Sequence, residues 1–129
     1  MQLRTASHVP ARTPGAQRPS VIVLFGADGD PDSVGLVRVT MEPGVEMPPH
    51  KHHGSDVIVT PVAGSVRMQS GQDTIEVAVG DSVLVGNDEA VSLLNHGTET
   101  AELIVAAGPT DFVATVARWP SAAESASVG

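Results

Sequence analysis

Turn-forming residues divide this chain into short apolar segments, and that spacing is the strongest constraint on how it can fold. From residue 21 onward a glycine recurs about every ten residues, as at Gly44, Gly54 and Gly64. No long stretch keeps the 3.6-residue periodicity of an amphipathic helix, whereas several runs alternate with period two, as Val37 and Val39 do. The sequence therefore predicts an all-β protein, either an antiparallel sandwich or a small jelly-roll-like barrel.

Nine segments between these turns have the pattern of a strand. They are residues 21–25, 34–41, 56–63, 65–70, 74–79, 82–85, 91–95, 101–107 and 111–118. The chain of 129 residues is long enough for one domain with a buried core. We expect an arm at residues 1–20, a barrel at residues 21–119 and a flexible tail at residues 120–129.

The composition excludes several classes of protein. The chain has no cysteine, which rules out a disulfide scaffold, a thiolate metal site and a cysteine nucleophile. No apolar run reaches the roughly 18 residues that a membrane-spanning helix needs. No hydrophobic segment follows Arg4 as it would in a signal peptide. We therefore expect a cytoplasmic protein without a membrane partner.

The charge balance disfavours nucleic acid as a partner. Acidic residues outnumber basic ones, 15 against 7, and the net charge of −8 repels phosphate. Residues 1–20 are the exception, because they hold arginines and no acid. This arm is either a basic segment that docks on its own barrel or a neighbour's, or a loosely ordered leader. Because small open barrels have edge strands that are usually covered, we expect a homodimer.

A cluster of histidines near the middle of the chain is the candidate functional site. His50 and His52 are two residues apart, so on a strand they project from the same face and could bind one metal ion. Asp56 brings a carboxylate back after a Gly-Ser turn. The alternative is that these histidines lie in a solvated loop. We expect His53 on the opposite face and Lys51 pointing outward.

The residues around this cluster resemble the cupin family. The first cupin motif has the form G-x5-H-x-H-x3,4-E-x6-G. Gly44, His50 and His52 match it in register, and Asp56 stands in the place of the glutamate. The resemblance covers residues from about 34 to 107. It implies a double-stranded β-helix, a small jelly-roll-like barrel, which agrees with the strand pattern.

The second cupin motif is incomplete in this chain. Its form is G-x5-P-x-G-x2-H-x3-N, of which Gly80 and Asn95 match, while Val91 stands where the family has histidine. The family's usual metal is held by three histidines and one glutamate, so the third histidine is missing here. His96 follows Asn95 in a turn, and we expect it at a solvated hairpin tip.

Without the third histidine, the remaining candidate ligands have the composition of a metal site made of two histidines and one carboxylate. We expect His50, His52 and Asp56 either to bind a divalent metal (iron, manganese, nickel or zinc) or to hold none. With a metal, the resemblance implies oxygenase-, isomerase- or lyase-type chemistry on a small-molecule substrate in an apolar barrel.

Two other functions stay open. One is a metal-free dehydratase or cyclase in which His50 or His52 is the catalytic general base. The other is a non-catalytic barrel that binds a small molecule. A register shift of one residue would also reverse which polar strand residues face the barrel interior. The residues concerned are Arg38, Arg67, Gln69 and Glu76.

Overall fold

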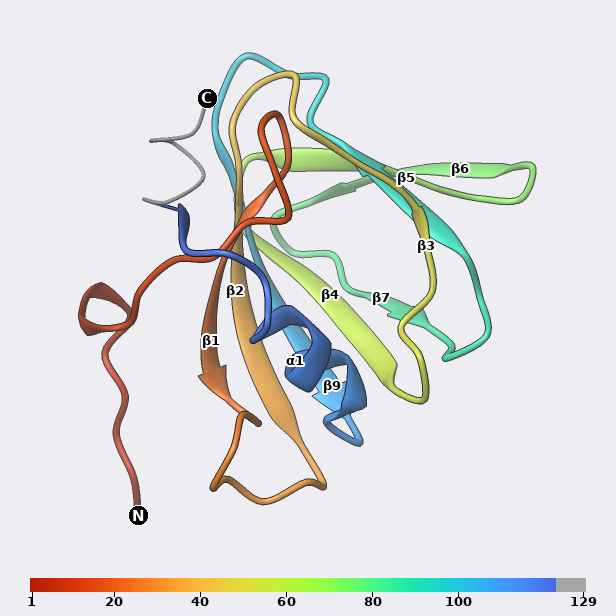
Figure 1. The fold of residues 1–129 in the computed structure, drawn as a ribbon. Coiled ribbons are helices and arrows are strands. Elements are labelled where there is room, and N and C mark those ends of the chain that lie inside the picture. Colours follow the sequence, from red (N-terminus) through yellow and green to blue (C-terminus); the bar gives the residue numbers. More distant parts are fainter. Residues whose placement is uncertain (123–129) are drawn as a thin grey trace.

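The computed structural model describes residues 1–122 and shows two antiparallel sheets packed face to face (Figure 1). The five-stranded sheet has the order β1 (Ser20–Phe25), β2 (Gly35–Met41), β9 (Ala101–Gly108), β4 (Asp56–Ala63) and β7 (Val83–Val85). The four-stranded sheet has the order β3 (Glu46–His50), β8 (Val91–Leu94), β5 (Ser65–Ser70) and β6 (Asp73–Ala78). The helices of the described residues are the 3-10 turn η1 (Ala6–His8) and α1 (Asp111–Val116), and neither is long and apolar enough to span a membrane. The predicted all-β barrel is confirmed.

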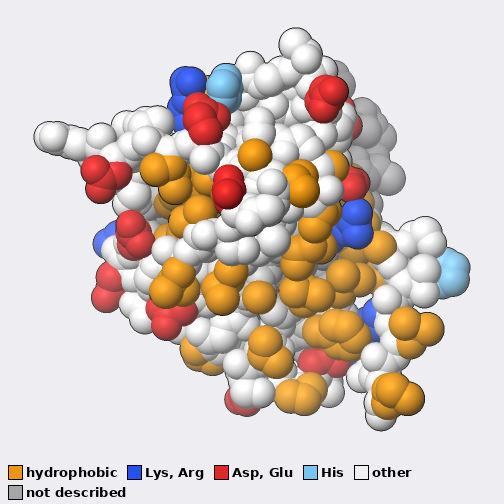
Figure 2. Space-filling view, turned by 180° about the vertical axis from the view of Figure 1, so that it is seen from behind, with side chains coloured by type: hydrophobic (Ala, Val, Ile, Leu, Met, Phe, Trp, Pro, Cys, Tyr) orange, Lys and Arg blue, Asp and Glu red, His pale blue; other side chains and the backbone are white. Residues whose placement is uncertain are grey.

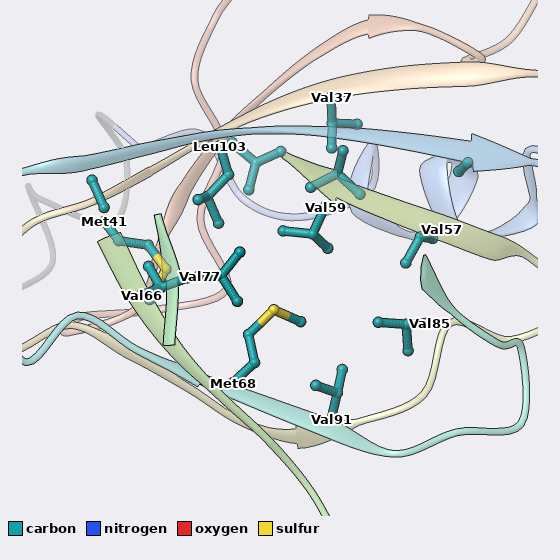
Figure 3. Packing of buried hydrophobic residues seen from close by; sticks show 14 of the residues in the cluster. Val37, Met41, Val57, Val59, Val66, Met68, Val77, Val85, Val91 and Leu103 are labelled. Carbon is teal, nitrogen blue, oxygen red and sulfur yellow. The ribbon is translucent and has the colours of Figure 1, made fainter. Parts of the chain in front are cut away.

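Alternation along the paired strands separates a buried face from an outer face. Val37 of β2 lies opposite Val105 of β9, which lies opposite Val59 of β4, and all three are buried. Figure 3 shows Val37 and Val59 pointing into the same interior as Met68 and Val91 of the four-stranded sheet. The core therefore lies between the two sheets.

The outer face of the five-stranded sheet carries an apolar row. Leu36, Ala106, Ile58 and Leu84 are cross-strand neighbours on four adjacent strands, and Leu84 is 69% exposed. Figure 2 shows apolar side chains gathered across the side of the molecule opposite to the view of Figure 1. The homodimer expected from the sequence stays a prediction, and this row is a surface that a second copy could cover.

The chain passes from one sheet to the other at Gly64, between β4 and β5. Its φ is +67°, in the left-handed region that favours glycine. A Cβ at this position would lie 2.8 Å from the carbonyl oxygen of Thr100 and 2.9 Å from the Cα of Ala101. Gly64 therefore lets the β4–β5 connection pack directly against the start of β9.

The strand pattern of the sequence does not predict β3, which contains Pro48 and Pro49. Proline cannot donate a hydrogen bond to a sheet and is confined to edge strands and bulges. β3 is an edge strand, and its pairing with β8 is irregular between Met47 and His50, where the two prolines lie. The prolines are thus accommodated, and the strand ends at His50.

The strand expected at residues 111–118 is wrong, because Asp111–Val116 forms helix α1. The run Phe112–Val116 is rich in residues that favour strands by local propensity. Val113 and Val116 are three residues apart and both are fully buried, so one short helix turns both inward. Tertiary packing therefore overrides local propensity in this segment.

The N-terminal arm lies on the barrel of its own chain. The backbone of Arg12 bridges to Val21 in β1 and to Ser121, and its guanidinium donates to the carbonyl oxygen of Trp119 at 2.9 Å. The two ends of the described chain are thus joined along the edge of β1. Most of the tail expected at residues 120–129 lies outside the described residues.

Asn95 is a buried polar residue that ties several segments together. Its Nδ2 donates to the carbonyl oxygens of Met41 and Glu99, both at 2.8 Å, and its Oδ1 accepts from the amide of Gly97 at 3.0 Å. Its backbone amide donates to the carbonyl oxygen of Val45 at 3.0 Å. One side chain therefore joins the end of β2 to the turn that precedes β9.

We predict that Asn95→Ala lowers the free energy of unfolding by about 2–4 kcal/mol, because it removes three side-chain hydrogen bonds and leaves buried groups unpaired. Urea unfolding followed by circular dichroism measures the change. Asn87→Ala, in the loop between β7 and β8, is the control and should stay within about 0.5 kcal/mol of the wild type. Equal effects of the two variants would contradict the role given to Asn95.

Candidate functional site

A cavity of about 60 Å³ lies inside the barrel, between the two sheets. Of the 15 residues that line it, all are apolar except His50 and His52. Phe112, Val116 and Trp119, from α1 and the segment after it, contribute to this wall. The cavity is therefore an apolar chamber that holds two imidazole rings.

His50 ends β3 and is half-buried. Its Nδ1 lies 2.9 Å from the carbonyl oxygen of Pro48. Because a carbonyl can only accept, Nδ1 is the donor, and the neutral ring keeps its lone pair on Nε2. Burial lowers the pKa of His50, and the hydrogen bond to Pro48 partly offsets this by favouring the protonated ring. His50 is thus a neutral imidazole whose Nε2 is available to a ligand.

His52 lies in the turn after β3 and is only 3% exposed. Its ring stands edge-to-face against His50, with 4.9 Å between centroids, and against Phe112, with 4.8 Å. Burial, and secondarily the positive charges that His50 and His53 carry when protonated, lower the pKa of His52 to about 4. Its Nδ1 is buried without a hydrogen-bond partner in residues 1–122. His52 is therefore neutral at pH 7.

Ser55 fixes the histidine turn against α1. It is fully buried, and its amide donates to the carbonyl oxygen of His52 at 3.1 Å. Its hydroxyl donates to the carbonyl oxygen of Pro109 and accepts from the amide of Phe112 at 3.0 Å. These bonds connect the segment that carries His52 to the helix that carries Phe112, so Ser55 helps to set how the two rings meet.

Asp56 is not brought to the two histidines. It is exposed at the start of β4, and its Oδ1 accepts from the amide of Asn87 at 3.0 Å. Because the neighbouring Val57 is buried, alternation along the strand turns Asp56 outward. Lys51 and His53 are exposed as well. Of the clustered polar residues, His50 and His52 alone line the cavity.

The remaining polar candidates lie on the outer surface. Glu76 accepts from Arg67 at 2.8 Å and lies 2.7 Å from His96, so these three form an exposed cluster. Arg38 pairs with Glu102 at 2.8 Å on the outer face of the five-stranded sheet. The structure thereby shows whether the four polar strand residues face the barrel interior. None of them lines the cavity: Arg38, Arg67, Gln69 and Glu76.

Sequence reasoning misses the aromatic side of the cavity. Phe112 belongs to the segment 111–118 that local propensity wrongly assigns to a strand, and Trp119 follows that segment directly. In the structure they line the cavity together with Pro19 from the arm, far away in the sequence. The composition offers one signal for these residues. The chain has only two phenylalanines and one tryptophan, so each of them stands out as a candidate for a binding site.

Comparison with known proteins identifies the family. The family model described as a cupin domain matches residues 37–107, more than half of the chain. The chain belongs to the cupin family. A search of curated proteins found no significant match.

Solved structures share the cupin fold with this chain at low sequence identity. KdgF from Halomonas sp. has a TM-score of 0.72 at 13% identity, covering 84% of this chain and 94% of that one. The polyketide cyclase RemF from Streptomyces resistomycificus has a TM-score of 0.70 at 22% identity, covering 84% and 79%. A predicted oxalate decarboxylase from Thermotoga maritima has a TM-score of 0.67 at 15% identity, covering 84% and 99%. At these identities the likeness establishes the fold alone.

Cupins often bind divalent metals, but the donor set of this cupin does not fit that role. Within residues 1–122 no three His, Cys, Asp or Glu side chains are grouped closely enough to hold a metal ion. His50 lies opposite Val91 in the pairing of β3 with β8, so a valine stands across from it where the second cupin motif has histidine. Valine cannot coordinate a metal. The structure places His50 beside His52 and leaves Asp56 outside.

We predict that His52 makes the protein less stable as the pH falls. Its pKa is about 4 in the folded chain and about 6.5 when unfolded, so between these values the unfolded state binds more protons. The free energy of unfolding therefore rises with pH in this window, by at most about 1.4 kcal/mol per pH unit from this residue. This contribution is lost as the pH falls from 6.5 toward 4. Urea unfolding at several pH values measures it.

Matched variants distinguish the contribution of His52 to the pH dependence of stability from that of the carboxylates, which also titrate at acidic pH. His52→Gln removes the titrating ring and should flatten the pH dependence relative to the wild type. His8→Gln replaces an exposed histidine and should keep the wild-type slope. Identical slopes in the wild type and His52→Gln would show that His52 is not held neutral by burial.

Proposed function

We propose that this cupin is a small-molecule enzyme, a dehydratase or cyclase, in which His50 transfers a proton and His52 donates a hydrogen bond without a metal. The observation that carries the proposal is that two neutral imidazoles are the polar side chains on the wall of an otherwise apolar cavity. Imidazole both accepts and donates a proton near neutral pH, which suits it to general acid–base catalysis.

In this proposal His50 is the general base. Its Nδ1 is committed to the Pro48 carbonyl, so Nε2 carries the lone pair that accepts the substrate proton. The hydrogen bond to Pro48 also stabilises the imidazolium that results. Dehydration of a hydroxy ketone and ring closure by carbonyl addition both begin with loss of a proton beside a carbonyl. One base in one position can therefore serve either reaction.

His52 is the hydrogen-bond donor to the oxygen that gains negative charge. A buried neutral imidazole can donate its N–H to such an oxygen without first losing a charge. The apolar wall strengthens this bond because few other dipoles compete with it. The ring of His52 is held between His50 and Phe112, at 4.9 and 4.8 Å between centroids. The imidazolium formed on His50 lies close enough to favour the same anion.

The comparisons support this reaction class and also leave a second candidate. RemF is described as a polyketide cyclase, and cyclisation is one of the two reactions proposed here. A metal-dependent oxygenase, isomerase or lyase is the second candidate, favoured by the adjacency of the two imidazoles. That candidate needs ligands beyond those that residues 1–122 bring together.

The test is deuterium exchange from D2O into phenylacetone, a neutral aromatic ketone, followed by NMR in the presence of EDTA. We predict that the protein accelerates exchange over buffer. His50→Gln should abolish the acceleration because it keeps a polar side chain but removes the base. His52→Phe should lower the rate roughly a hundredfold, because it removes the hydrogen-bond donor while keeping a flat ring.

The control is His96→Gln, which changes an exposed histidine outside the cavity and should leave the exchange rate unchanged. Exchange that appears only after a divalent metal is added would favour the metal-dependent candidate over this proposal. Exchange that never exceeds the buffer rate would leave a barrel that binds without catalysis.

A further inference from the structure

We infer that the ligand of this cavity is a neutral aromatic ring that carries a hydroxyl group, in other words a phenol. The inference rests on the proposed function, because it names the ring by which the same site recognises a substrate whose carbonyl side chain reacts. Four properties of the cavity carry it: the charge of the wall, its aromatic residues, an imidazole that lacks a partner, and its size.

The wall has no permanently charged group that could neutralise a charged ligand, because its only titratable side chains, His50 and His52, are neutral at pH 7. None of the 15 lining residues is Lys, Arg, Asp or Glu. Arg38 and Arg67, which could have bound a carboxylate from an inward position, are engaged in ion pairs on the outer faces of the sheets. Burying a carboxylate or phosphate without a partner is strongly unfavourable. The cavity therefore selects against organic anions.

The aromatic residues of the chain are concentrated at this cavity. The chain has only two phenylalanines, one tryptophan and no tyrosine, and both Phe112 and Trp119 line the wall. Together with His50 and His52 they present four flat rings to a ligand. Edge-to-face and offset-stacked contacts favour an aromatic ligand over a saturated one of similar size.

The imidazole of His52 has a nitrogen that forms no hydrogen bond with the described residues. Its Nδ1 is buried and unpartnered, which is unfavourable for a polar atom. A half-turn of the ring about its Cβ–Cγ bond exchanges the positions of Nδ1 and Cδ2, and the ring itself lines the cavity. That turn keeps the ring plane, and so preserves the edge-to-face contacts with His50 and Phe112. A hydroxyl on the ligand can then complete the hydrogen bonding of His52.

The size of the cavity limits the ligand to no more than one ring. Its volume is about 60 Å³, less than half of the roughly 150 Å³ of an apolar cavity that holds benzene. A single ring therefore enters only when the wall moves or when part of the ring stays at the mouth of the cavity. Fused ring systems would need more room still.

The test follows Trp119, the only tryptophan of the chain, whose fluorescence reports directly on the cavity that it lines. The probes are phenol, toluene, cyclohexanol and benzoate at pH 7, with each Kd verified by isothermal titration calorimetry. Phenol should bind most tightly. Cyclohexanol, which lacks the aromatic ring, and toluene, which lacks the hydroxyl, should each bind roughly tenfold more weakly. Benzoate should bind at least about a hundredfold more weakly because its charge has no partner.

Two variants assign the hydroxyl preference to His52. His52→Phe keeps a flat ring against Phe112 but has no ring nitrogen, so it should raise the Kd of phenol to that of toluene and leave toluene unchanged. His96→Phe is the matched control, since it makes the same replacement at an exposed histidine. It should leave all four Kd values unchanged.

The inference is overturned if benzoate or cyclohexanol binds as tightly as phenol, or if no probe changes the fluorescence of Trp119. Its failure can be told apart from failure of the proposed function. Deuterium exchange into phenylacetone without a preference for phenol would retain the catalytic role and overturn the ligand class. A preference for phenol without exchange would support the ligand class and contradict the catalytic role.

Discussion

Alternation of side chains along β4 decides what kind of site this cupin has. Val57 and Val59 face the core with exposed fractions of 0% and 4%, so the preceding Asp56 must face solvent. A shift of one residue that turned Asp56 inward would expose both valines, at a cost of roughly 1.5–3 kcal/mol each. Burial of the two valines in the core therefore keeps this carboxylate away from His50 and His52.

A second constraint acts from the opposite sheet, at Val91. This residue is 3% exposed and shares the core with Met68 and Val85 (Figure 3). The valine across from His50 supplies no donor atom, and the other residues that line the cavity beside the imidazole pair are apolar. Burial then favours the neutral form of both rings, since a charged imidazole in such surroundings loses its hydration. Neutral rings in an apolar chamber are suited to proton transfer and to hydrogen bonding with an uncharged ligand.

The sequence predicts this fold well where side chains alternate over several residues, as around Val37, because the burial of such strands follows from local spacing. It also predicts the meeting of His50 and His52, although His52 reaches His50 from the turn after β3 and not from the same strand face. It fails where packing overrides local preference, as in α1. Phe112 and Trp119 reach the cavity only because the two ends of the chain pack together, and no local pattern carries that information. The outward position of Asp56 required the register of β4, which spacing from the histidines does not reveal.

The most direct test of the central claim, that the pair acts as neutral imidazoles rather than as metal ligands, is NMR of the ring nitrogens of His50 and His52 during titration with Zn²⁺. We predict that at pH 7 His50 is a neutral tautomer protonated on Nδ1, and that stoichiometric Zn²⁺ changes neither ring. Val91→His, which puts a third imidazole opposite His50, is the positive control. A stoichiometric change in the nitrogen shifts of both rings of the wild type would contradict the account.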